Sequence, residues 1–408
     1  MTSPRSPLFD PERMRVYPRL AVIVYVLAGF AMIASATSMI DVFGKPLGYD
    51  FITFWAASHL TLAGDPVGAF NLSHILAAEQ LAVPANTEVF LWHYPPVYQM
   101  FVAPLALMPY GLSWFVFVGL GVGLYLPTMR PLFDSKLASG RDALFLALAF
   151  PGAFICIFHG QNSLYSAAIL VGGLLLLERG RPWLAGFVLG VLVYKPQLGV
   201  LLPLAFLASG QWRVFLATGA SAFALLLLSY LVFGPDLWQA FFDNTPIVRE
   251  VMEQGMLPWA KMPSAFVFLR EFGVPQSLAY AAQALTALVV AACTALVWRR
   301  KGASRLSWAV LIVATLLVSP YAFDYGFAIL APALAIIGSD MAEKGTSRRE
   351  KIWLIMLFAM PLAVAPFAQA THFQIGFLLL VSALALAVRR VLPDFSLTFA
   401  KLSTPAGL

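Results

Sequence analysis

"LAVIVYVLAGFAMIASATSMI", residues Leu20 to Ile40, decides the fold class of this chain. The run contains no charged residue, and about 20 apolar residues in an α-helix are enough to cross the hydrocarbon core of a bilayer. Four arginines, the last of them Arg19, precede the run, so a cleaved signal peptide is the alternative. The run is longer than the apolar core of an ordinary signal peptide, and we predict an uncleaved first membrane span.

The composition extends this prediction to the whole chain. Of 408 residues, 60% are hydrophobic and 11% are charged, whereas soluble proteins carry about 25% charged residues. So few polar residues cannot cover a globular surface, and we predict one all-α polytopic membrane domain over residues 20–390. The net charge of +6 follows the predicted loops, so no nucleic-acid partner is expected. No motif for a metal or a nucleotide is present, and we predict neither metal nor cofactor.

Apolar segments recur along the chain, and we count about twelve predicted spans. Two of them, between residues 183 and 208, are short and are either two crossings or one re-entrant hairpin. Both alternatives leave the two termini on the same side. The predicted spans are residues 20–40, 111–129, 143–158, 163–177, 183–194, 197–208, 214–233, 277–298, 306–318, 321–337, 352–368 and 373–388.

The basic residues orient this topology. Of the 26 Lys and Arg residues, 21 fall on the side of the termini. Since cytoplasmic loops carry the excess of basic residues, both termini are predicted to be cytoplasmic. Residues 1–19 and 391–408 are then cytoplasmic segments, and the long loops 41–96 and 234–276 are periplasmic, at the inner membrane of a bacterium. The five remaining basic residues face the periplasm: Lys45, Lys195, Arg249, Lys261 and Arg270.

The first periplasmic loop contains "GYDFITFWAASHLTLAGDP", residues 48–66. Phe51, Phe54 and Trp55 recur at helical spacing and predict a short amphipathic surface helix that begins after Asp50. Asp50 is either the N-cap of that helix or a carboxylate that acts as a general base on a hydroxyl group. A second surface helix is predicted over residues 70–82, and residues 97–108 are predicted to dip into the outer leaflet.

Two outward turns carry further polar residues. Trp92, His93 and Tyr94 are predicted to form an aromatic belt at the headgroup level, with the alternative that His93 and Tyr94 line a polar cavity. In "FHGQNSLY", His159, Gln161 and Asn162 are costly at membrane depth unless they are paired or hydrated. Turn chemistry explains Asn162 without a function, but it does not explain Gln161.

Two charged residues lie between apolar runs. Lys195, in "VYKPQLG", either snorkels to the interface or binds a phosphate group near the start of the following helix. Asp324, in "SPYAFDYGF", either caps the next span or is a functional carboxylate, with Lys195 or Arg270 as a possible partner.

Four blocks of the chain together resemble glycosyltransferase family 87, a family of polytopic GT-C enzymes that use polyprenyl-phosphate sugars. They are "GYDFITFWAASHLTLAGDP", "HYPPVYQMFVAPLALMP", the run from "GQNSLY" to "VYKPQLGVLLPL", and "SPYAFDYGF", which occur in family order between residues 48 and 334. The resemblance implies a GT-C fold and an inverting transfer of a hexose, with mannose as the expected sugar. The donor is a polyprenyl-phosphate sugar, the acceptor is a lipid or a glycan, and membrane lipids surround the protein.

The resemblance also implies roles for individual residues. Asp50 corresponds to the catalytic base, and Lys195 with Gln197 to the donor-phosphate site. The family usually has a histidine after the aspartate of its last block, where this chain has Tyr325. A lipid-linked-sugar flippase or transporter is the alternative function, but the two halves of the chain show no repeat. Residues expected to contact the sugar or the acceptor are His93, Tyr94, His159, Gln161, Asn162, Asp324 and Tyr325.

Overall fold

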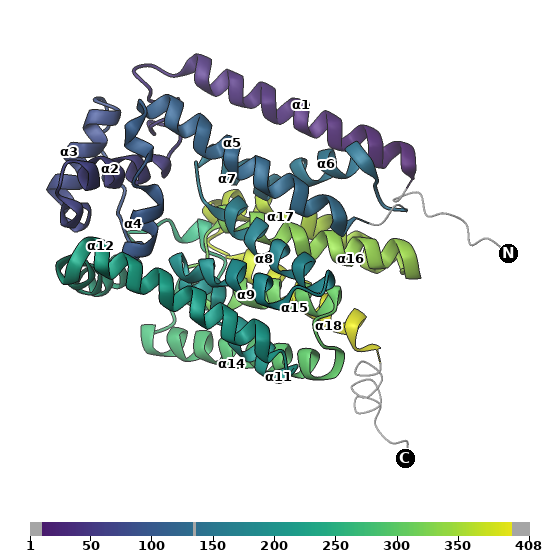
Figure 1. Cartoon of the computed structure of the whole chain (residues 1–408). Coiled ribbons are helices and arrows are strands. Elements are labelled where there is room, and N and C mark those ends of the chain that lie inside the picture. Colours follow the sequence, from purple (N-terminus) through teal and green to yellow (C-terminus); the bar gives the residue numbers. More distant parts are fainter. Residues whose placement is uncertain (1–9, 134–135, 394–408) are drawn as a thin grey trace.

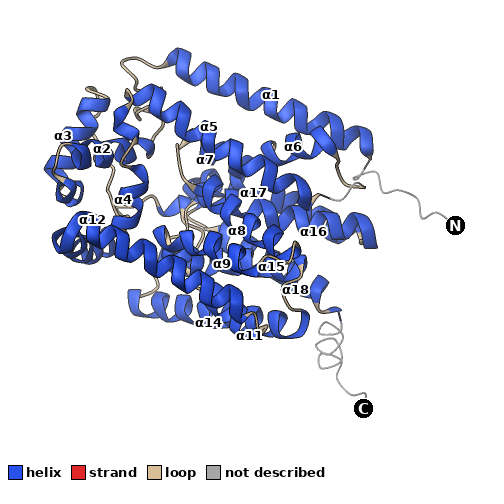
Figure 2. Cartoon of the chain, in the orientation of Figure 1, coloured by secondary structure: helices blue, strands red, loops and turns tan. Residues whose placement is uncertain are grey.

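The computed structural model describes residues 10–133 and 136–393, and this part of the chain is built from helices (Figures 1 and 2). It contains no β-strand, only isolated bridges that join Thr37 to Ile40 and Ile40 to Pro46. The prediction of an all-α chain is confirmed. The remaining residues of the two predicted cytoplasmic ends, 1–9 and 394–408, lie outside the described part.

Most connections between the helices are short, and the longest are residues 36–50 and 83–95. Several begin with proline at the first or second position, where a missing backbone N–H costs nothing. The α-helices are α1 (Pro11–Ser35), α2 (Phe51–Leu62), α3 (Leu72–Ala82), α4 (Pro96–Val102), α5 (Tyr110–Met129), α6 (Gly140–Leu148), α7 (Pro151–Phe158), α8 (Ser163–Glu178), α9 (Pro182–Gly190), α10 (Pro196–Gly199), α11 (Leu202–Ala208), α12 (Trp212–Glu253), α13 (Ala265–Glu271), α14 (Gln276–Lys301), α15 (Arg305–Val318), α16 (Leu330–Lys344), α17 (Arg348–Thr371) and α18 (Ile375–Val391). The short 3₁₀ helices are η2 (Pro66–Phe70), η3 (Leu105–Leu107), η4 (Arg130–Leu132), η5 (Val191–Tyr194), η6 (Trp259–Lys261) and η7 (Asp324–Ile329).

Six helical segments of the described residues are long and apolar enough to cross a membrane. They are α1, α5 with η4, α12, α14, η7 with α16, and α17. A seventh arises if α6 and α7, bent by 60° where Pro151 begins α7, count as one span. Helices lie over all twelve predicted segments. The helices that do not belong to these seven candidate spans are shorter than the roughly 20 residues that a crossing needs. The structure therefore fits a polytopic membrane protein, while twelve crossings and a GT-C fold stay predictions.

The bundle has a buried centre and an apolar outer face. α15 and α16 are buried over residues 307–317 and 330–341, and Trp308 of α15 packs edge to face on Trp298 of α14 at 5.4 Å between ring centres. α1, α12 and α14 instead expose large apolar side chains, such as Phe30 and Leu288. An exposed apolar helix face is unfavourable in water and suits the hydrocarbon of a bilayer.

Three short helices, α2, α3 and α4, gather at one end of the bundle, while α1 begins and α18 ends toward the opposite end (Figure 1). α2 begins after Asp50 as predicted, but the prediction that it is an amphipathic surface helix is wrong. Nine of its twelve residues are buried because α3, α4, η2 and η3 pack around it. Apolar residues on every face indicate a buried helix rather than an interfacial one.

The second long loop, residues 234–276, is largely helical. Gly234, with φ of 75° and ψ of −178°, bends the chain, and α12 continues beyond it to Glu253. The turn η6 and the helix α13 complete the segment. Gln374 at the start of α18 is fully buried and donates hydrogen bonds to the carbonyl oxygens of Trp259 (3.1 Å) and Ala260 (2.9 Å). This side chain ties η6 to the bundle.

Candidate active site

Asp50 stands immediately before α2, and its carboxylate does not cap the helix. Its backbone is already helical, with φ of −64° and ψ of −15°, whereas a capping residue usually has extended dihedral angles. Gly48 and Tyr49 take the positive φ values, 89° and 45°, that turn the chain into the helix. Asp50 therefore occupies the N-cap position of α2, as one alternative predicted, but its side chain makes no capping hydrogen bond. Its Oδ2 accepts a 2.8 Å hydrogen bond from Nε2 of Gln161 instead.

Gln161 and Asn162 form the turn between α7 and α8, and both are buried. Gly160 lets this turn lie against α2. Its φ is 55°, and a Cβ at this position would stand 2.5 Å from the Cβ of Phe51. The Oε1 atom of Gln161 accepts a 3.3 Å hydrogen bond from the hydroxyl of Tyr94. One buried amide group therefore connects the carboxylate before α2 to a buried phenol.

Lys195 lies between η5 and α10, and its ammonium group points at the same turn. Nζ donates a 2.9 Å hydrogen bond to Oδ1 of Asn162 and lies 5.8 Å and 5.7 Å from the ring centres of Tyr94 and Tyr325. None of the ion pairs within the described residues includes Lys195. This inward contact differs from what a snorkelling lysine would make, and the charge is available to an anionic ligand.

The helix that follows Lys195 adds little to an anion site. α10 has only four residues, and Pro196 has no backbone N–H to donate. Gln197 lies in α10, and none of the hydrogen bonds found in the described part joins it to the other predicted site residues. A phosphate at this position would therefore depend on the lysine itself.

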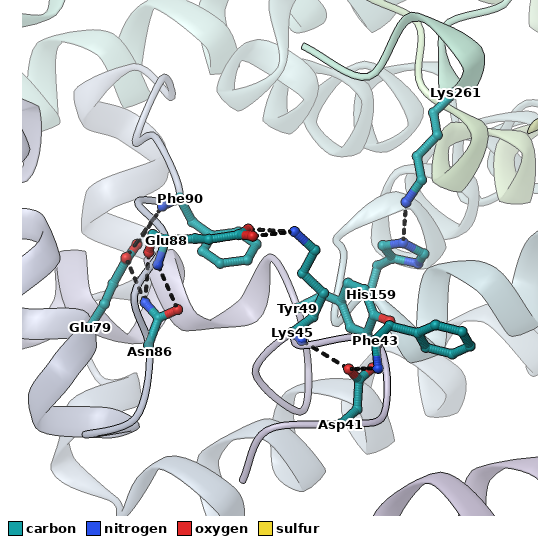
Figure 3. Close-up of polar contacts among 10 residues, drawn as sticks. All are labelled: Asp41, Phe43, Lys45, Tyr49, Glu79, Asn86, Glu88, Phe90, His159 and Lys261. Atoms are coloured by element: carbon teal, nitrogen blue, oxygen red, sulfur yellow. Dashed lines mark hydrogen bonds and ion pairs between the residues drawn. The ribbon is translucent and has the colours of Figure 1, made fainter. Parts of the chain in front are cut away.

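A second lysine, Lys261, reaches the site from η6. Its Nζ lies 3.2 Å from Nε2 of His159 (Figure 3). Nδ1 of the same ring donates a 2.9 Å hydrogen bond to the carbonyl of Ile155. Because that carbonyl can only accept, Nδ1 carries the proton, and Nε2 of the neutral ring accepts from the ammonium group. The ring of His159 also lies 4.8 Å from that of Tyr49 and 6.1 Å from that of Tyr325.

Asp324 begins η7 and is 3% exposed. Its Oδ1 accepts a 2.8 Å hydrogen bond from the backbone N–H of Tyr325. The predicted ion pair with Lys195 or Arg270 is not formed among the described residues: Arg270 donates to the carbonyl of Val274 at 2.9 Å instead. The positive charge that acts most strongly on the Asp324 carboxylate is that of Lys261.

The three aromatic residues at positions 92–94 do not form a belt. Trp92 and Tyr94 are buried, and Trp92 stacks on Tyr98 at 5.8 Å between ring centres. The belt alternative is wrong for these two residues because the helices around α2 cover them. His93 is exposed and stacks on Tyr94 at 4.6 Å, so it touches the site only through that ring.

An apolar cavity of about 600 Å³ opens beside the site, between α1 and α7. Tyr49 and His159 close its polar end. The rest of its wall is mostly apolar and is formed by Ala28, Ala31, Met32, Ser35, Val42, Phe43, Phe154, Ile155 and Phe158. The cavity therefore puts an apolar wall beside His159, two residues before Gln161 in the chain.

The structure thus brings together Asp50 and Lys195 through the neighbouring amides of Gln161 and Asn162. His159, Tyr94 and Tyr325 border this group, while Gln197 and His93 stay outside its hydrogen bonds. Lys261 was not predicted as a site residue. The sequence feature that could have identified it is that Lys261 is one of five basic residues on the predicted outer side. Tyr49 was also missed, because nothing in its local sequence marks it.

The comparisons with known proteins give one match. The family model of glycosyltransferase family 87 matches residues 92–320, which is more than half of the chain. The matched range includes His159, Gln161, Asn162, Lys195 and Lys261. No curated protein and no solved structure matches the chain.

Proposed function

Because the chain belongs to glycosyltransferase family 87, we propose that it transfers a hexose, with mannose the first candidate, from a polyprenyl-phosphate donor to a lipid or glycan acceptor. One observation carries this proposal. A carboxylate, Asp50, and a cation, Lys195, are each hydrogen-bonded to one of two adjacent residues of the same turn, at 2.8 Å and 2.9 Å. A base and a cation are the two groups that an inverting transfer from a sugar phosphate needs.

In the proposed reaction, Asp50 accepts the proton of the acceptor hydroxyl as its oxygen attacks the anomeric carbon. The bond from that carbon to the phosphate oxygen breaks, and the electron pair leaves with the polyprenyl phosphate. Lys195 offsets the negative charge that develops on this leaving group, which stabilises the transition state. The amide of Gln161 orients the carboxylate, and the proton ends on Asp50. Attack opposite the leaving group inverts the anomeric configuration.

The side of the membrane on which the site lies is also part of the proposal. The basic residues favour cytoplasmic termini, which puts α2, α3 and the site on the periplasmic side of a bacterial inner membrane. The cavity between α1 and α7 supports a lipid-borne substrate, because its apolar wall suits an isoprenoid or acyl chain and its polar end borders the site.

The test is a transfer assay with purified protein, a radiolabelled polyprenyl-phosphate mannose and a membrane lipid extract. Wild type is expected to release polyprenyl phosphate and to move the label to a new lipid or glycan. Asp50→Asn is expected to lower kcat by about 10²- to 10⁴-fold, the usual contribution of a general base. Lys195→Met is expected to lower transfer as well, with part of the activity restored in Lys195→Arg.

Asp243→Asn is the matched control, since Asp243 is another carboxylate of the predicted outer side and pairs with Gln239 of α12, away from the site. It is expected to transfer sugar at the wild-type rate. Wild-type protein that binds the donor, moves it across vesicles and transfers no sugar from any polyprenyl phosphate would instead support a flippase. Undiminished transfer by folded Asp50→Asn would remove Asp50 from the mechanism.

A further inference from the structure

Residues 36–50, which connect α1 to α2, have a strained backbone. In the described part of the chain, four residues other than glycine have a positive φ, and three of them lie in this segment: Ser38 (53°), Met39 (63°) and Tyr49 (45°). A left-handed backbone is unfavourable for a residue with a Cβ and persists only where the surrounding structure enforces it. Tyr49 directly precedes Asp50, so this strain adjoins the proposed base.

Asp41 is the side chain that holds this segment together. It is 5% exposed, and its carboxylate accepts three hydrogen bonds from within the segment. Oδ1 accepts from the backbone N–H groups of Phe43 and Lys45, both at 2.9 Å, and Oδ2 accepts from the hydroxyl of Tyr49 at 2.7 Å (Figure 3). Hydrogen bonds offset the cost of burying a carboxylate, and these bonds connect the first half of the segment to its end.

Tyr49 is held at its hydroxyl, its ring and its backbone. The hydroxyl donates to Asp41, and the ring lies 4.8 Å from the ring of His159. The backbone N–H donates a 2.8 Å hydrogen bond to the carbonyl of Pro46. A change of the Tyr49 backbone to an ordinary conformation would redirect the side chain and break its contacts with Asp41 and His159. These two contacts therefore offset the strain of the left-handed backbone.

The position of the Asp50 carboxylate depends on this backbone. Within the described residues, its one side-chain hydrogen bond comes from Gln161, and it makes no capping bond to α2. The side chain of an aspartate is short, so its carboxylate moves with the backbone that carries it. The conformation of Tyr49, the preceding residue, therefore sets the direction in which the carboxylate leaves the chain.

We propose that Asp41 and Tyr49 are positioning residues for the transfer reaction. The hydrogen bond between them keeps the backbone before α2 in the conformation that directs Asp50 toward the acceptor hydroxyl. This inference rests on the proposed role of Asp50 as the base. A reacting group that is displaced by about 1 Å can lose about 10²-fold in rate, so a contact one residue away from the base has a kinetic effect.

Steady-state transfer kinetics of the full chain test this proposal. Tyr49→Phe removes the hydroxyl alone and is expected to lower kcat by about 10- to 100-fold, with the KM for the donor unchanged. Asp41→Asn keeps an oxygen for the two backbone N–H groups, and its amide can donate to the Tyr49 oxygen, so it is expected to lose less than Asp41→Ala. Asp41→Ala combined with Tyr49→Phe is expected to be no slower than the slower single variant, because both changes break the same bond.

Tyr280→Phe is the matched control. The hydroxyl of Tyr280 in α14 donates to the carboxylate of Glu253 in α12 at the same 2.7 Å, outside the hydrogen bonds that join Asp50 and Lys195 to their turn. Tyr280→Phe is expected to lower the unfolding temperature as Tyr49→Phe does and to keep the wild-type kcat. Hydrogen exchange of the peptide that covers residues 47–54 is expected to be faster in Tyr49→Phe than in wild type or in Tyr280→Phe.

The outcomes separate this inference from the proposed function. A wild-type kcat for Tyr49→Phe, with Asp50→Asn impaired, would overturn the positioning role and leave the proposed function standing. Undiminished transfer by folded Asp50→Asn would remove the base, and this inference with it. Equal losses of kcat in Tyr49→Phe and Tyr280→Phe, or unchanged hydrogen exchange in Tyr49→Phe, would also overturn the positioning role.

Discussion

Nε2 of Gln161 lies 2.8 Å from Oδ2 of Asp50, although 111 residues separate the two in sequence. The other end of the same amide accepts a hydrogen bond from Tyr94, so the amide cannot turn over without losing both bonds. The carboxylate is therefore held in one orientation, and no residue of the described part donates a hydrogen bond to its Oδ1. An oriented carboxylate with one uncommitted oxygen suits a general base.

Gln161→Ala removes the group that orients this carboxylate. A hydrogen bond to a charged group contributes about 1.5–3 kcal/mol, so kcat is expected to fall by about 10- to 100-fold, with little change in the KM for the donor. Steady-state transfer kinetics give both values. Gln239→Ala is the control, because Gln239 makes the same 2.8 Å bond to Asp243 on an exposed face of α12. A wild-type kcat for Gln161→Ala would show that Asp50 does not need this partner.

Gly160→Ala is expected to lower both thermal stability and transfer. The left-handed backbone costs an alanine about 1–2 kcal/mol, and its Cβ would also collide with Phe51 and with the carbonyl of Gly48. Gly180→Ala separates the two effects, since Gly180 has φ of 68° and an added Cβ there would meet nothing within 4 Å. Thermal unfolding in detergent measures the difference. Equal losses in the two variants would mean that the contact with α2 is unimportant.

Lys261→Met removes the charge that lies beside His159 and acts on buried Asp324. The free energy of unfolding is expected to fall by about 1–3 kcal/mol, because a buried carboxylate loses its favourable partner. Lys261→Arg keeps the charge and is expected to lose less. The double variant Lys261→Met with Asp324→Asn should be less destabilised than the sum of the single variants. Strictly additive losses would show that the two residues do not interact.

Glu79 of α3 predicts a pH dependence of stability. The side chain is fully buried beside Asn86 and the backbone N–H of Phe90 (Figure 3), and burial raises the pKa of its carboxyl to about 8 from an ordinary 4.5. Between these two values, the folded state keeps a proton that the unfolded state releases. The free energy of unfolding therefore falls as pH rises through this window, by up to about 1.4 kcal/mol per pH unit.

Thermal unfolding of wild type, Glu79→Gln and Glu250→Gln at pH 5, 6.5 and 8 checks this dependence. The unfolding temperature of wild type is expected to fall with pH, and that of Glu79→Gln to fall less, because glutamine has no proton to lose. Glu250 is exposed on α12, and its replacement should leave the wild-type slope. An identical slope for Glu79→Gln would assign the dependence to other groups.

The local sequence pattern predicted the existence of helices more accurately than it predicted where they begin and end or how deeply they are buried. The first span was predicted over residues 20–40, but α1 begins at Pro11, because Asp10 caps a polar first turn that apolar counting ignores. α2 was predicted from its aromatic spacing, and its existence was correct. Its burial was not predictable, because the helices that cover it come from later parts of the chain.

The sequence alone determined that the chain is helical and apolar and that its basic residues fall mostly in loops on one side. These properties follow from composition and from residues close together in the chain. It also carried the family resemblance. Tertiary structure decided which polar residues meet: Gln161 with Asp50, Asn162 with Lys195, and His159 with Lys261. The first and last of these pairs join residues 111 and 102 positions apart. Such contacts depend on how helices pack and where glycine permits close approach, which no local pattern of side chains encodes.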